Sequence, residues 1–315
     1  MTATPLPTPK PMPELARAGW RDYVRLARAS NLPTCLSNVL AGAALGRAAA
    51  GAEAPAIAWA SLGLTALGVA LLYVAGMALN DWADAAVDAV ERPSRPIPSG
   101  RVSRAAALRF VVVCLVAGSG AVLAAQWRAW PLLAALVACI VAYDLLHLRL
   151  AAAPVLMGLC RSLVYLTAAA VAHGEPGRWA GSQWALVGGP AAAIGAYTLG
   201  ITLIAAKETG GPVGWRRWAS LGMPVVVLAG ALGPRGGVEG LAWGFVGLFV
   251  VWMAFPIRWV MRRPPQTVRA VLAWLSGMCL VDACVLAALG LLGQAGVAVA
   301  CFGLTAWGHR RVLGT

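Results

Sequence analysis

Residues 56–79, AIAWASLGLTALGVALLYVAGMAL, form an uncharged apolar run that passes directly into the polar sequence NDWADAAVD of residues 80–88. The apolar run exceeds the roughly 20 residues that an α-helix needs to cross the hydrocarbon core of a bilayer. A helix is required there, because lipid offers no partners for exposed backbone hydrogen-bonding groups. The sequence therefore predicts a membrane-spanning helix that leads into a carboxylate-rich segment.

The remainder of the chain is similarly apolar. Of its 315 residues, 60% are hydrophobic and 12% are charged, and its mean hydropathy is +0.75, whereas a soluble domain carries about a quarter charged residues. Further apolar runs lie near residues 32–48, 105–125, 130–146, 154–172, 184–206, 217–233, 240–260 and 267–292, with a shorter one at 295–308. We therefore expect an all-α fold, a polytopic transmembrane bundle of nine or ten helices.

The basic residues predict how this bundle is oriented. The chain has 25 Lys and Arg against 12 Asp and Glu, a net charge of +13, and contact with anionic lipid explains this excess better than nucleic-acid binding does. Most basic residues outside the N-terminal segment fall in alternate linkers, namely Arg92, Arg95, Arg101, Arg104, Arg149, Lys207, Arg216, Arg217, Arg258, Arg262 and Arg263. By the positive-inside rule, these linkers and residues 1–28 are expected to be cytoplasmic. Residues 29–315 would form a single domain in the cytoplasmic membrane.

Asp81, Asp84 and Asp88 follow the first apolar run described above at helical spacing. At about 100° per residue, Asp84 lies about 60° and Asp88 about 20° from Asp81, so the three carboxylates would share one face of a continuing helix. Stacked carboxylates near a low-dielectric boundary are costly unless a cation compensates them. Magnesium prefers oxygen ligands of this kind and completes its shell with substrate phosphate. The alternative is a solvated acidic helix end balanced by the arginines that follow it.

A proline-rich sequence, ERPSRPIPSGRVS, occupies residues 91–103. Its three prolines and its glycine exclude a continuing helix and predict a stiff, ordered loop. This loop presents Arg92, Arg95 and Arg101, whose guanidinium groups can bind phosphate oxygens in bidentate fashion. The alternative for any one of these arginines is contact with lipid headgroups.

Residues 80–88 match the pattern NDxxDxxxD, and residues 92–103, RPSRPIPSGRVS, are similar to the segment that follows that pattern in UbiA-family intramembrane prenyltransferases. Tyr143-Asp144 at the end of the fourth run and Gly158-Leu159-Cys160-Arg161 in the fifth add to the resemblance. An intramembrane cation such as Arg161 is functional or paired by default. The resemblance implies a helical bundle with a central cavity that is capped on the cytoplasmic side and open laterally to lipid.

The resemblance also implies an activity, namely Mg²⁺-dependent transfer of an isoprenyl group from a prenyl diphosphate to a lipophilic or membrane-surface acceptor. Charge drawn onto the departing diphosphate would leave an allylic, carbocation-like centre for the acceptor to attack. The implied metal ligands are Asp81, Asp84 and Asp88, and the implied catalytic residues are these three with Asp144, Lys207 and Glu208. The implied substrate-binding residues are Asn80, Arg92, Arg95, Arg101, Tyr143, Arg149 and Arg161. We expect His147 near the same face.

The sequence departs from the family pattern after the sixth run, where members usually carry a second motif of the form DxxxD. Residues 204–211 read IAAKETGG instead, with one lysine and one carboxylate. We expect Lys207 to supply positive charge that a second metal would bring, and Glu208 to bind magnesium or to pair with Lys207. The alternative is a lysine that extends to the interface beside a neighbouring glutamate. Asp282, midway through an apolar run, would orient an acceptor hydroxyl or bond a neighbouring helix.

Two other functions agree with the same residues. A UbiA-type terpene cyclase would begin with the same ionisation, after which the cation is attacked by its own alkene. A non-catalytic lipid carrier or transporter would keep the fold without turnover, although a transporter more typically distributes polar residues through the bilayer midplane. Most charge in this sequence lies at segment ends, which favours the transferase.

Overall fold

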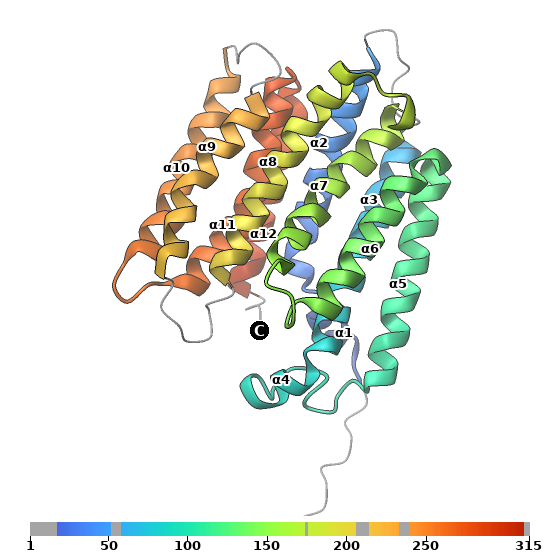
Figure 1. Ribbon diagram of the computed structural model, residues 1–315, viewed down its shortest axis with the longest axis vertical. Coiled ribbons are helices and arrows are strands. Elements are labelled where there is room, and N and C mark those ends of the chain that lie inside the picture. The colour runs from blue at the N-terminus through green and yellow to red at the C-terminus, as the bar shows by residue number, and fades with distance from the viewer. Residues whose placement is uncertain (1–17, 52–57, 174–175, 206–213, 233–239, 312–315) are drawn as a thin grey trace, which may run out of the picture.

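A computed structural model describes residues 18–51, 58–173, 176–205, 214–232 and 240–311. The described residues contain twelve α-helices, four short 3₁₀ helices and no strand, and the long helices run side by side as one bundle (Figure 1). The helices are α1 (Trp20–Leu26), α2 (Leu32–Ala50), α3 (Trp59–Ala83), α4 (Ala85–Glu91), α5 (Arg104–Ala125), α6 (Trp130–Leu146), α7 (Ala153–His173), α8 (Gly181–Ala205), α9 (Ala219–Leu232), α10 (Ala242–Met261), α11 (Thr267–Ala288) and α12 (Leu292–Arg311). The 3₁₀ helices are η1 (Ala29–Asn31), η2 (Trp127–Ala129), η3 (Pro176–Arg178) and η4 (Gly214–Trp218). The prediction of an all-α fold is confirmed.

Seven segments of the described chain are long and apolar enough to cross a membrane. They are Trp59–Ala83, Arg104–Ala125, Trp127–Leu146, Ala153–His173, Gly181–Ala205, Ala242–Met261 and Thr267–Ala288. Their number and composition are those of a multi-pass membrane protein. The expected count of nine or ten spans is not confirmed for the described chain, because α2, α9 and α12 are not among these seven; α9 has only 14 residues. The predicted central cavity and its cap likewise stay predictions.

The last helix, α12, is longer than the apolar run that predicted it. The run at 295–308 lies inside α12, whose 20 residues continue through His309 to Arg311. A helix is not limited to its apolar residues, because its backbone hydrogen bonds extend through polar residues at the ends. The length of α12 therefore could not be read from hydropathy.

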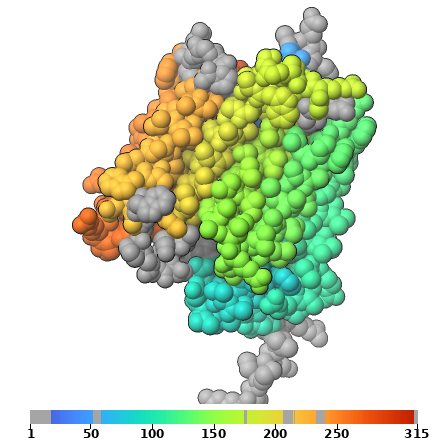
Figure 2. Space-filling view, viewed as in Figure 1, coloured from blue at the N-terminus to red at the C-terminus, as the bar shows by residue number. Residues whose placement is uncertain are grey.

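The basic linkers gather at one end of the bundle. Figure 1 shows α4, the linker from α6 to α7 and the linker from α10 to α11 at the same end as α1. The space-filling view from the same side shows α4 on the surface at that end (Figure 2). We call this the basic end; it carries Arg92, Arg149 and Arg262. A positive-inside pattern produces this segregation, and the cytoplasmic orientation remains a prediction.

The core is built around α11, of which 89% of the most apolar window is buried. A helix that is apolar on all sides is stable only when other helices surround it, and α2, α8, α10 and α12 pack on it. On the other side of α2, glycines allow α7 to approach closely. A Cβ at Gly42 would lie 2.6 Å from the carbonyl oxygen of Tyr165, and one at Gly46 would clash with the backbone of Ala169. Small residues at such contacts let membrane helices pack backbone to backbone.

Candidate active site at the basic end

The carboxylate-rich segment forms two helices joined at one residue. Helix α3 ends at Ala83, α4 begins at Ala85, and Asp84 between them has φ −81° and ψ 0°. Helical hydrogen bonds cross the junction, from the N–H of Asp84 to the carbonyl oxygen of Asn80 at 2.9 Å and from Asp88 to Asp84 at 2.8 Å. The expected single continuing helix is therefore wrong in detail, because the change in ψ at Asp84 interrupts it.

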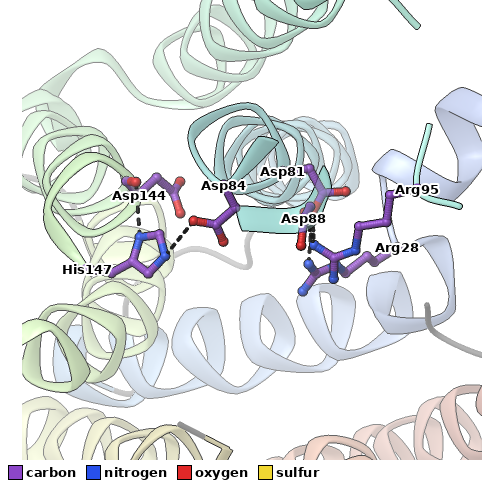
Figure 3. Close-up of polar contacts among 7 residues, drawn as sticks. All are labelled: Arg28, Asp81, Asp84, Asp88, Arg95, Asp144 and His147. Atoms are coloured by element: carbon purple, nitrogen blue, oxygen red, sulfur yellow. Dashed lines mark hydrogen bonds and ion pairs between the residues drawn. The ribbon is translucent and has the colours of Figure 1, made fainter. Parts of the chain in front are cut away.

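The three carboxylates do not converge on one point. Figure 3 shows Asp81 and Asp88 pointing toward Arg95 and Arg28, whereas Asp84 points away from them toward His147. Over the described ranges, no group of three His, Cys, Asp or Glu side chains is arranged to hold a metal ion. The expectation that the three carboxylates share a face is thus not met in this structure.

Asp81, Asp88 and Arg95 form a buried ion-pair cluster. Nη1 of Arg95 lies 2.6 Å from Oδ2 of Asp88 and 3.2 Å from Oδ1 of Asp81, which also receives Nη2 of Arg28 at 3.0 Å. Asp81, Asp88 and Arg95 are each 5% exposed or less. Buried charges persist only when they are paired and hydrogen-bonded. The cluster therefore holds carboxylates and guanidinium groups in direct contact at the basic end.

Arg28 was not predicted as a site residue. It has φ 43°, which makes it the non-glycine residue with a left-handed backbone among the described residues, and it connects α1 to η1. Such conformations are uncommon outside glycine and cluster at functional sites. In the sequence its only signal was membership of the basic N-terminal segment, because its partner Asp81 is 53 residues away.

Asp84 lies with His147 and Asp144 on the other side of α3. Nε2 of His147 is 3.0 Å from Oδ1 of Asp84, and Nδ1 of His147 is 3.1 Å from the carbonyl oxygen of Asp144. The ring of Tyr143 stacks on His147, with centroids 5.4 Å apart. The Asp84 carboxylate raises the pKa of His147 above its usual value of 6.5 against the opposing effect of burial. The structure thus gathers Asp84, Tyr143 and the backbone of Asp144 around His147, and their roles in a site stay predictions.

The proline-rich loop is ordered, but its arginines separate. Ile97 and Val102 are buried and anchor the loop. Arg95 turns inward to the carboxylates, whereas Arg101 donates from Nε to Oδ1 of Asp22 at 2.8 Å and from Nη2 to the carbonyl oxygen of Ser94 at 2.7 Å. Arg101 therefore ties the loop to α1.

The remaining predicted substrate-binding residues differ in exposure. Arg92 is half-buried and Arg149 is exposed. Asn80 is half-buried within the last turn of α3. Arg161 lies farther into the bundle, where Nη1 donates to Oδ1 of Asn38 at 2.7 Å. Lys207 and Glu208 lie outside the described residues.

Asp22→Asn is expected to remove a pH-dependent part of the stability. Burial alone would raise the pKa of Asp22, but the hydrogen bonds from Arg101 and Gly19 and the charges of Arg101 and Arg25 hold it below its ordinary value of 3.8. A carboxyl group with a lowered folded-state pKa stabilises the protein above its unfolded-state pKa and loses that effect as pH falls through the folded-state value. The melting temperatures of the wild type and of Asp22→Asn should differ at neutral pH and should converge as the pH falls below 3.8. Equal melting temperatures at neutral pH would contradict this.

The donor atoms at the basic end are suited to magnesium. Asp81, Asp84 and Asp88 supply hard oxygen ligands, and Mg²⁺ typically takes one or two carboxylates and completes its shell with water and phosphate. Oδ1 of Asp84 is buried, and its contact with His147 is not aligned as a hydrogen bond. A buried carboxylate oxygen without an aligned donor is one that a cation can satisfy. These residues therefore fit Mg²⁺ as individual ligands.

The chain is similar in sequence to known membrane prenyltransferases. A family model described as the UbiA prenyltransferase family matches residues 39–278. A digeranylgeranylglyceryl phosphate synthase from Methanopyrus kandleri is 40% identical over 105 residues, which is 32% of this chain and 34% of that protein. A protoheme IX farnesyltransferase from Hahella chejuensis is 34% identical over 150 residues, which is 45% of this chain and 47% of that protein. The matched segments thus span between a third and a half of these two relatives.

Solved structures resemble the fold over most of its length. A UbiA homolog from Archaeoglobus fulgidus bound to GPP and Mg²⁺ has a TM-score of 0.61 at 13% identity, covering 90% of this chain and 99% of that one. The apo structure of a UbiA homolog from Aeropyrum pernix K1 has a TM-score of 0.61 at 20% identity, covering 85% and 96%. At such identities the likeness concerns the fold alone.

Proposed function

The chain belongs to the UbiA prenyltransferase family, and from this premise we propose that it transfers an isoprenyl group from a prenyl diphosphate to an acceptor in the membrane. One observation carries the proposal: the carboxylates Asp81, Asp84 and Asp88 and the guanidinium groups of Arg28 and Arg95 gather at one end of an apolar bundle. A polar head and an apolar tail would find matching surroundings there.

Magnesium is proposed as the cofactor, with Asp81, Asp84 and Asp88 as the residues that would hold it. When bound, Mg²⁺ neutralises charge that develops on a departing diphosphate. Two structures of a UbiA homolog from Archaeoglobus fulgidus, bound to Mg²⁺ with GPP or with DMAPP, support this choice. Lys207 and Glu208 remain proposed contributors of charge near the same head group.

The arginines of the site would exchange partners when the diphosphate binds. In the present structure Arg28 and Arg95 neutralise Asp81 and Asp88. Guanidinium groups bind phosphate oxygens as well as carboxylates. We infer that they turn from the carboxylates to the diphosphate, so that carboxylate oxygens become available as metal ligands. Arg161 would bind the same diphosphate from inside the bundle, with Arg92, Arg101 and Arg149 as further proposed contacts.

The residues on the other side of α3 would set the protonation state and the orientation of Asp84. His147, with its raised pKa, is held between Asp84 and the backbone of Asp144. We propose that it keeps Asp84 ionised and oriented, and that Asp144, Tyr143 and Asn80 line the approach of the reacting groups. A charge held in place before reaction costs no reorganisation when the diphosphate departs.

The donor and acceptor classes are proposed from the relatives. GPP and DMAPP are the diphosphates named in the homolog structures, and the sequence relatives are named for a glyceryl phosphate lipid and for protoheme IX. We propose a prenyl diphosphate as the donor, and a glyceryl phosphate lipid or a protoheme as the lipophilic acceptor. The site would face the cytoplasm from the cytoplasmic membrane, since the basic end carries the positive charge.

An assay of purified protein with these donors and acceptors tests the proposal. Geranyl and dimethylallyl diphosphate would be offered with Mg²⁺, alone and with a prenylated glyceryl phosphate or protoheme IX, and products identified by mass. Diphosphate release together with a prenylated acceptor supports the transferase. A cyclic hydrocarbon formed without acceptor would point to a cyclase, and no diphosphate release with any combination would contradict both enzymes.

A further inference from the structure

A buried polar network joins α2, α7 and α11 beside the candidate site. Asp282 of α11 is fully buried, and Nδ2 of Asn38 in α2 lies 2.9 and 2.8 Å from its two carboxylate oxygens. The hydroxyl of Tyr165 in α7 donates another hydrogen bond to the same carboxylate. A carboxylate in an apolar interior persists only when its oxygens are satisfied in this way. Asp282 therefore bonds two neighbouring helices.

The same network reaches Arg161. Nη1 of Arg161 donates to Oδ1 of Asn38 at 2.7 Å, and Nη2 donates to Oγ1 of Thr34 at 3.3 Å. The guanidinium group lies over the ring of Tyr73, 5.8 Å from its centroid. Tyr73 belongs to α3, the helix that carries Asp81 in its last turn. Arg161 is thus the part of the network that contacts the helix of the carboxylate cluster.

The hydrogen-bonding chemistry permits one orientation of Asn38. A guanidinium group only donates, and an ionised carboxylate only accepts. The amide nitrogen of Asn38 must therefore face Asp282, and its oxygen must face Arg161, as found. A flipped amide would place donor against donor at Arg161 and acceptor against acceptor at Asp282. The carboxylate of Asp282 consequently determines what Asn38 offers to Arg161.

We propose that Asp282 is a positioning residue that acts through Asn38 to hold the Arg161 guanidinium group in place for the diphosphate. The proposal rests on the proposed function, because it takes the diphosphate as the ligand of Arg161. Neither Asn38 nor Asp282 falls within the matched residues 39–278. The simpler alternative is that Asp282 only fastens α11 to its neighbours. Tyr165 distinguishes the two roles, because its hydroxyl bonds Asp282 directly, whereas the link from Asp282 to Arg161 runs through Asn38.

A double-mutant cycle on diphosphate affinity tests the proposal. The probe is geranyl thiolodiphosphate, a non-hydrolysable prenyl diphosphate, titrated with Mg²⁺ into protein in detergent micelles by calorimetry. Arg161→Gln should weaken binding about tenfold, because it removes a charge-assisted hydrogen bond to the diphosphate. Asp282→Asn, which keeps the side-chain volume, should weaken it about three- to tenfold, and the double variant should bind no more weakly than Arg161→Gln alone.

Tyr165→Phe is the matched control. It removes a hydrogen bond from the same carboxylate, so it should lower the melting temperature while leaving the affinity for the probe at the wild-type value. Wild-type affinity in Asp282→Asn, or losses that multiply in the double variant, would overturn the proposal. Equal losses of affinity in Tyr165→Phe and Asp282→Asn would overturn it in favour of the fastening role. If Asp282→Asn does not fold, Asn38→Ala breaks the same link and carries the same expectations.

A second measurement does not depend on catalysis. The side-chain ¹⁵N resonances of Arg161, assigned by their loss in Arg161→Gln, should shift in Asp282→Asn and stay in place in Tyr165→Phe. Unchanged resonances in Asp282→Asn would overturn the positioning role even in an active enzyme. Shifted resonances in a protein that does not bind the probe would support the control of Arg161 by Asp282 and contradict the proposed function.

Discussion

Asp84→Asn is expected to lower prenyl transfer about 10³-fold, which corresponds to about 4 kcal/mol of transition-state stabilisation. Asp84 is the carboxylate of its segment that contacts no arginine among the described residues, and its buried Oδ1 receives no aligned hydrogen bond. Asparagine keeps the shape of the side chain, but it loses the negative charge that attracts a divalent cation. The loss should therefore fall on turnover and leave folding intact.

The measurement is turnover of geranyl diphosphate as a function of Mg²⁺ concentration. The midpoint of the Mg²⁺ dependence should move to higher concentration in Asp84→Asn, with the melting temperature close to that of the wild type. Glu91→Gln is the matched control, because Glu91 is an exposed carboxylate only two turns away at the end of α4. Turnover of Asp84→Asn at the level of Glu91→Gln would contradict the assignment of Asp84.

Arg95→Met is expected to reduce the free energy of unfolding by about 3 kcal/mol, because it leaves a buried carboxylate without its partner. Arg95 is 4% exposed and bridges Asp81 and Asp88. Methionine fills a similar length but donates no hydrogen bond. Asp81 keeps Arg28 as a partner, so most of the loss should arise at Asp88.

Unfolding in detergent micelles, followed by circular dichroism, checks this expectation. Arg109→Met is the matched control: Arg109 is exposed on α5, and the change should alter stability by less than about 0.5 kcal/mol. Asp88→Asn added to Arg95→Met should recover part of the loss, because it removes the uncompensated charge. Equal stability of the two methionine variants would show that the cluster does not stabilise the fold.

Hydropathy predicted the helices well because each long apolar run must be helical in lipid. It predicted α11 as a span, and the structure shows why this run has so little polar character: other helices surround it. Hydropathy could not count the spans, since α9 and the polar ends of α12 depend on packing and on helix continuation. The proline-rich loop was also predicted, because proline excludes a helix by its own chemistry.

The contacts among the predicted site residues could not be read from the sequence. The helical spacing predicted Asp81, Asp84 and Asp88 on one face. The helix is interrupted at Asp84, however, and the Asp84 side chain points toward His147. The pairing of Asp81 with Arg28 joins residues 53 apart, and that of Asn38 with Asp282 joins residues 244 apart. Such pairings follow from tertiary packing, which a periodic pattern does not encode.

The close contact of α2 with α7 bears on how a long substrate could enter. Because Gly42 and Gly46 bring the two backbones together, no side chain can swing aside there to open a passage, and the two helices should move as a unit. An isoprenyl tail entering from the lipid would therefore have to pass between a different pair of helices. A larger side chain at Gly46 would distort α2 and α7, which carry Asn38 and Arg161, without creating an opening between them.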